Sequence, residues 1–144
     1  MRRVWVLLAV AALVSGVAAY LYYFAWPESL LDTTRIASYS YGAQGVNPLE
    51  YTKVTRADDP ATFDRLMALV RDAPVARPQV TRAPGRLMLI LHRDDGLQYR
   101  LFLDGPRGDG TWQVGISEGD ESYLGTLDQP QLVELLRGFE AKLP

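Results

Sequence analysis

Hydrophobic and polar positions follow three different patterns along this chain, and each pattern predicts a different kind of element. Residues 4–26 form an uncharged run of 23 residues, which as a helix is about 34 Å long and so exceeds a hydrocarbon core of about 30 Å. Apolar residues three and four positions apart predict amphipathic helices at residues 60–72 and 129–143. Alternating, β-branched and aromatic stretches predict strands, at residues 35–41, 49–55, 86–93, 97–104, 111–116 and 122–127.

The order of these elements predicts the fold class. Asp59 is expected to cap the first amphipathic helix, with Pro60 at its first position, and Asp128 to cap the second. Residues 73–85 contain three prolines and are therefore expected to form an extended arm. Short connections between consecutive strands favour an antiparallel sheet. We therefore predict an α+β, two-layer domain with both helices on one face of the sheet.

The most specific strand signal is a hairpin around Asp94, Asp95 and Gly96. A three-residue loop with glycine at its left-handed position fits this tripeptide. The resulting register matches apolar residues on one face of the two strands, pairing Leu91 with Tyr99, Leu89 with Leu101 and Leu87 with Leu103.

The same register directs Met88, Ile90 and Phe102 to the opposite face, with Met88 across from Phe102. A solvated antiparallel face is normally polar, so we expect this apolar strip to be covered. One candidate is the arm at residues 73–85, through Val75 and Val80. The other is an envelope protein partner, which we favour because exposed apolar patches on extracellular domains so often mark interaction sites.

The N-terminal run has two interpretations. As an uncleaved signal anchor, it places residues 4–26 in the bilayer with tyrosines and a tryptophan at the far interface. As a signal peptide, it is cleaved after Ala19 and the protein is secreted. We favour the anchor, because a signal peptide gains nothing from aromatic residues beyond its cleavage site. Arg2 and Arg3 then keep the N-terminus in the cytoplasm, with residues 27–34 as a tether and residues 35–144 as an extracytoplasmic domain.

Charge disfavours one class of partner, and composition excludes two covalent features. All 17 acidic residues but only 13 of the 15 basic residues lie in residues 27–144, giving that part a formal charge of −4. This disfavours nucleic acid, whose binding depends on neutralising phosphates. The chain has no cysteine, which excludes disulfides and a lipid-bearing N-terminal cysteine. Thirteen of the basic residues are arginine, which we interpret as the codon bias of a GC-rich bacterium.

Residues that could perform catalysis are few. His92 is the one histidine, so a two-histidine metal site and a histidine dyad are excluded. It falls on the outer sheet face near Gln98, where we interpret it as a surface histidine rather than a general base. Hydrolase motifs and glycine-rich phosphate loops are lacking. We therefore predict no catalytic residue and no cofactor.

Two acidic loops are expected at the same end of the sheet. Their carboxylates are candidate ligands for Ca²⁺, a hard cation that takes six to eight oxygens, and belong to Asp94, Asp95, Glu118, Asp120 and Glu121. The spacing is not that of a known calcium loop, and hairpin tips are commonly acidic because they are solvated. We therefore assign no metal site here.

The order of segments resembles that of small bacterial putative-lipoprotein domains of unknown function, anchored outside the cell membrane. The matching segments are YTKVTRADDPATFDRLMALV, RLMLILHRDDGLQYRLFL and YLGTLDQPQLVELLRGF, although the lipid-bearing cysteine is missing. The resemblance implies an anchored envelope domain and transfers no catalytic residue. We expect a non-catalytic binding or interaction module. The alternatives are a carboxylate-dependent or calcium-binding envelope enzyme and a secreted protein.

Overall fold

The elements of this protein begin and end largely where local sequence signals place them. The computed structural model describes residues 1–24, 31–76, 84–106, 108–119 and 122–144. The chain divides into two compact units, Met1–Leu30 and Leu31–Pro144. In chain order the elements are α1 (Arg2–Phe24), η2 (Thr33–Arg35), β1 (Ile36–Ala43), η3 (Pro48–Glu50), β2 (Thr52–Thr55), α2 (Pro60–Asp72), β3 (Val75–Ala76), β4 (Pro84–Arg93), β5 (Gln98–Asp104), β6 (Gln113–Glu118), β7 (Ser122–Leu127) and α3 (Pro130–Ala141).

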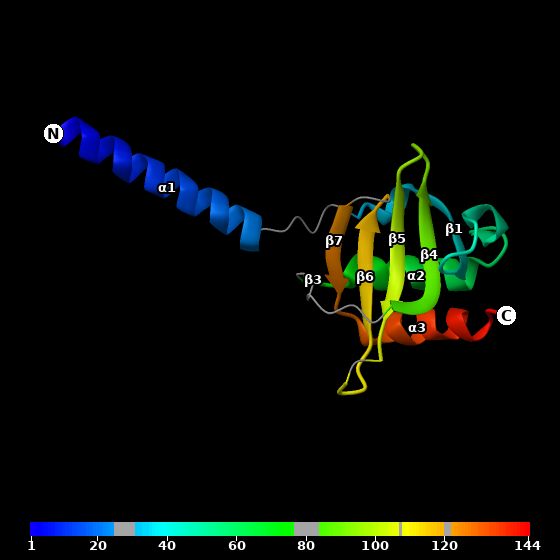
Figure 1. The fold of residues 1–144 in the computed structure, drawn as a ribbon. Helices are drawn as coiled ribbons and strands as arrows, with labels where there is room; N and C mark the ends of the chain where they lie inside the picture. Colours follow the sequence, from blue (N-terminus) through cyan, green and yellow to red (C-terminus); the bar gives the residue numbers. More distant parts are fainter. Residues whose placement is uncertain (25–30, 77–83, 107, 120–121) are drawn as a thin grey trace. The chain divides into compact units, whose positions relative to one another are not determined.

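The second unit has the predicted α+β architecture. Its seven strands form one sheet in the order β2-β1-β4-β5-β6-β7-β3, and every neighbouring pair is antiparallel. Helices α2 and α3 lie together on one face of that sheet (Figure 1). The layout follows from short connections and from the single apolar stripe on each helix, which must be buried against the sheet.

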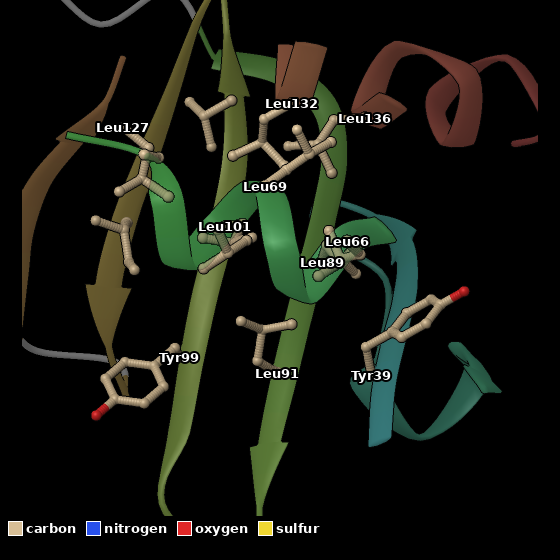
Figure 2. Packing of buried hydrophobic residues seen from close by; sticks show 14 of the residues in the cluster. Tyr39, Leu66, Leu69, Leu89, Leu91, Tyr99, Leu101, Leu127, Leu132 and Leu136 are labelled. Atoms are coloured by element: carbon tan, nitrogen blue, oxygen red, sulfur yellow. The ribbon is translucent and has the colours of Figure 1, made fainter. Parts of the chain in front are cut away.

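The core lies between the two helices and the inward face of the sheet (Figure 2). Leu89, Leu91 and Leu101 point into it from the central hairpin and are fully buried. Helix α2 contributes Leu66, and α3 contributes Leu136. At about 1.5–3 kcal/mol for each fully buried large apolar side chain, this layer supplies most of the driving force for folding.

Three expectations about element boundaries are wrong. Residues 49–51 are not strand: Asn47 accepts a hydrogen bond from the Leu49 N–H and Pro48 begins η3. The cap of α3 is Gln129 rather than Asp128, because Pro130 occupies the first helical position and the cap precedes it. The Asp128 N–H instead donates to the Pro74 carbonyl oxygen.

The third concerns the arm, which is not entirely irregular. Val75 and Ala76 form the short edge strand β3, paired with β7. Val75 lies opposite the buried Leu127 and packs against the core, on the helix side of the sheet. It therefore does not cover the strip around Met88, and Val80 lies outside the described residues.

Candidate functional site

The outer face of the sheet is built from cross-strand rows that match the predicted hairpin register. Met88 pairs with Phe102, and Leu91 pairs with Tyr99 on the other face, as expected. Ile90 also points outward, yet it is only 2% exposed. Met88 and Phe102 are half-buried. The apolar strip is thus largely covered within the chain, and its role as a partner surface stays a prediction.

Two glycines explain part of this burial, because each lies beneath an aromatic ring. A Cβ atom on Gly42 of β1 would lie 2.2 Å from Cδ1 of Tyr51, and one on Gly115 of β6 would lie 2.2 Å from Cε2 of Phe102. The absence of side chains on both glycines lets the two rings lie flat against the sheet, an arrangement that shields glycine backbone. Since β4 lies between β1 and β6 in the sheet, the two rings flank Met88 and Ile90.

Residues 44–51 form a loop that closes over the outer face. Gly45 has φ +83°, a left-handed conformation that favours glycine and lets the chain reverse after β1. The Gln44 side chain donates to the Leu87 carbonyl oxygen at 3.3 Å, which ties the loop to β4. The Tyr51 hydroxyl donates to the Ala43 carbonyl oxygen at 2.9 Å, which closes the loop on its own beginning. The sequence interpretation missed this cover, since it took residues 49–51 as strand.

An open pocket of about 520 Å³ lies between this loop and the sheet. Met88 and Ile90 contribute its apolar sheet side, Val46 and Tyr51 come from the loop region, and Arg100 comes from β5. Arg100 is the one charged residue among the described residues that line it. Gln44 and Asn47 add polar groups to the lining, so the pocket combines apolar and polar surface with a single cation.

The electrostatics of the outer face follow from partial burial and from two cations. Burial raises the pKa of Tyr51, and Arg100 opposes that rise. Burial also lowers the pKa of His92, and Lys53 lowers it further. Both shifts favour the neutral forms of these two rings.

His92 makes a hydrogen bond that the sequence interpretation did not anticipate. Its Nε2 lies 2.8 Å from the Ser40 hydroxyl oxygen across the β1–β4 pair. A serine–histidine pair is a component of nucleophilic catalysis, but such a site also needs an accessible serine and a group that orients the imidazole. Ser40 is only 5% exposed, and no carboxylate contributes to the shift in the His92 pKa. The pair is consistent with a structural role.

Asp94 and Asp95, two of the candidate calcium ligands, have arginine partners. Asp94 forms an ion pair with Arg35 at 3.0 Å, and Asp95 pairs with Arg93 at 2.8 Å and with Arg35 at 3.5 Å. A hydrogen bond from the Leu97 N–H, followed by Arg93 and Arg35, lowers the pKa of Asp95.

Glu118 alone among the other three candidates belongs to the described residues. Glu118 is half-buried on β6 opposite Tyr99, and Asp120 and Glu121 lie outside the described residues. Across the part of the chain that the structure describes, no group of three or more histidine, cysteine, aspartate or glutamate residues is arranged to hold a metal ion.

The N-terminal unit contains a single described helix, α1. Its segment Arg2–Tyr20 has a mean hydropathy of 1.9 and is long and apolar enough to cross a membrane, by length and composition. Signal sequences at an N-terminus meet the same criteria. Apolar residues occur all around α1 rather than on one stripe, unlike the amphipathic helices α2 and α3.

Comparisons with other proteins leave the family open. Neither a protein family, nor a curated protein, nor a solved structure matches this chain. The resemblance to small envelope lipoprotein domains therefore remains one of segment order. The two features of this chain that bear on its function are α1 and the outer face of the sheet.

Proposed function

We propose that this chain is a single-pass membrane protein of the bacterial envelope, whose α+β domain lies outside the cytoplasm and binds a partner at the outer face of its sheet. The observation that carries the proposal is helix α1. Residues 4–24 contain no charged residue, and the exposed large apolar side chains of α1 are spread around the helix, from Val4 to Tyr20. Water is a poor solvent for such a surface, whereas a bilayer covers it at no cost in unsatisfied backbone groups.

Orientation follows from the distribution of charge around the span. Arg2 and Arg3 precede it, and Glu28 and Asp32 are the first charged residues after it. Basic residues are retained on the cytoplasmic side of a single span. This asymmetry favours an N-terminus inside the cell and a domain outside it.

The binding role is supported by the outer face rather than by any catalytic arrangement. A pocket of about 520 Å³ opens there, and the loop that borders it carries exposed apolar residues, with Leu49 91% and Val46 41% exposed. Exposed apolar side chains beside a pocket are typical of interaction sites. The described residues of this face offer no acid–base pair that would favour an enzyme instead.

The orientation is testable by cysteine labelling, because the natural chain has no cysteine. We expect Ala61→Cys, at an exposed position in the first turn of α2, to react with a membrane-impermeant maleimide in intact spheroplasts. Ala9→Cys, within the span, should not react under the same conditions. The protein should remain in the membrane fraction after an alkaline carbonate wash.

Two results would contradict the proposal. Labelling of the Ala61→Cys variant only after permeabilisation would place the domain in the cytoplasm. Release of the chain by carbonate would remove the anchor.

A further inference from the structure

Charge is unevenly distributed over the domain, and the described central rows of the outer face carry basic residues. Residues 27–144 have a formal charge of −4. The cross-strand rows through Met88, Ile90 and His92 lie on the outer face. Their described residues include the cations Lys53 and Arg100, and none of them is acidic. Lys53 on β2 and Arg100 on β5 lie in one cross-strand row, and their positive charge favours an anionic ligand at this face.

The pocket adds the shape of that ligand. The guanidinium of Arg100 is a planar set of N–H donors that can bind both oxygens of a carboxylate. It therefore suits a carboxylate better than the point charge of a lysine would. Accessible apolar surface beside it comes from Met88, which is half-buried, and from Val46, which is 41% exposed. The volume of about 520 Å³ falls within the range of about 300–1,000 Å³ that is typical of small-molecule sites. A matching ligand has one negative group and a compact apolar body.

We propose that this pocket binds a small organic carboxylate, with its carboxylate at Arg100 and its apolar body against Met88 and Val46. The proposal rests on the proposed binding role of the outer face and adds the chemical class of the ligand. It does not require Arg100 to lack other contacts, because a guanidinium has five N–H donors and can hold a carboxylate beside an existing partner. Tyr51, held by its hydrogen bond to the Ala43 carbonyl oxygen, keeps the loop side of the pocket in place.

Methyl NMR tests the proposal directly, because the chain has only three methionines. The full chain, labelled at its methionine methyl groups and embedded in neutral-lipid nanodiscs, is titrated with phenylacetate. We expect the Met88 methyl signal to shift in a saturable way. The Met67 signal should stay in place, because Met67 is buried on α2 in the core of the domain. Phenylacetamide, a neutral molecule of the same shape, should bind at least tenfold more weakly.

Variants of the arginine decide whether the charge is responsible. Arg100→Gln should weaken phenylacetate binding at least tenfold and remove the preference over phenylacetamide, whereas Arg100→Lys should keep part of that preference. Arg65→Gln, at an exposed position on α2, is the matched control and should bind like the natural chain. The Met67 signal reports whether each variant is folded.

The opposing results are equally clear. No shift of Met88 in the folded natural chain, equal binding of the two compounds, or unchanged binding in Arg100→Gln would overturn the proposed ligand class. None of these results would alter the cysteine labelling that tests the membrane orientation, so the two proposals fail separately.

Discussion

The contact between Tyr51 and Gly42 is expected to control both the stability of the domain and the pocket. Replacing Gly42 by alanine would place a Cβ atom 2.2 Å from Cδ1 and 2.8 Å from Cγ of the Tyr51 ring. Rotation of the ring about the Cβ–Cγ bond cannot relieve a clash that includes Cγ, so the whole Tyr51 side chain or its backbone has to move. The hydrogen bond from the Tyr51 hydroxyl to the Ala43 carbonyl oxygen, now 2.9 Å long, should then be lost.

The magnitude follows from two contributions. Overpacking of a well-packed site costs about 1–3 kcal/mol, and the lost hydrogen bond contributes about 1 kcal/mol. We therefore expect Gly42→Ala to reduce the free energy of unfolding by about 2–4 kcal/mol. For a domain of this size that corresponds to a decrease in Tm of about 4 °C per kcal/mol. Urea unfolding followed by circular dichroism measures the effect.

A double-mutant cycle isolates the cause. In a Tyr51→Ala background the added Cβ meets no ring, so Gly42→Ala should cost less than about 0.5 kcal/mol, since alanine is no worse than glycine in a strand. An equal cost in both backgrounds would refute the explanation. A neutral effect of Gly42→Ala in the natural chain would refute it as well.

Three further changes have defined outcomes. Glu140→Ala should destabilise the domain by about 1–2 kcal/mol, because the Glu140 carboxylate accepts hydrogen bonds from the Arg86 and Leu87 N–H groups. The control variant Glu134→Ala, on the exposed side of α3, should be nearly neutral in the same denaturation assay. Burial, followed by Lys53, lowers the pKa of His92 in the folded chain. Below about pH 6.5 the unfolded chain therefore binds more protons than the folded chain, and the free energy of unfolding should decrease as the pH falls. His92→Gln should remove this dependence, and an unchanged slope would exclude His92 as its origin. A chain comprising residues 29–144 should unfold cooperatively, with a midpoint that neither calcium nor a chelator changes, since Asp94 and Asp95 are paired with arginines. A strong rise of the unfolding midpoint with calcium would instead identify the acidic loops as a calcium site.

The layers of the fold were predictable because they depend on local patterns. Helix α2 has its cap at Asp59 and its apolar stripe in the sequence itself, and the hairpin register follows from Gly96 and from matching leucines. Short connections then leave few topologies.

The candidate site was less predictable because it depends on contacts between distant residues. Ser40 and His92 are 52 positions apart, so their hydrogen bond appears only once β1 pairs with β4. Residues 49–51 have the apolar and aromatic content of a strand. Capping by Asn47 instead forms η3, and the fit of Tyr51 on Gly42 places Tyr51 at the side of the pocket. Nothing in the local pattern reports that fit.

The mass of the mature protein tests most directly whether α1 remains attached as a membrane anchor. Protein purified from membranes and measured by intact mass spectrometry should correspond to the full chain of 16.1 kDa, with Met1 still joined to the domain. Cleavage after Ala19 would instead give a shorter chain beginning at Tyr20, recovered in the soluble fraction. That result would contradict the anchor and make this a secreted protein.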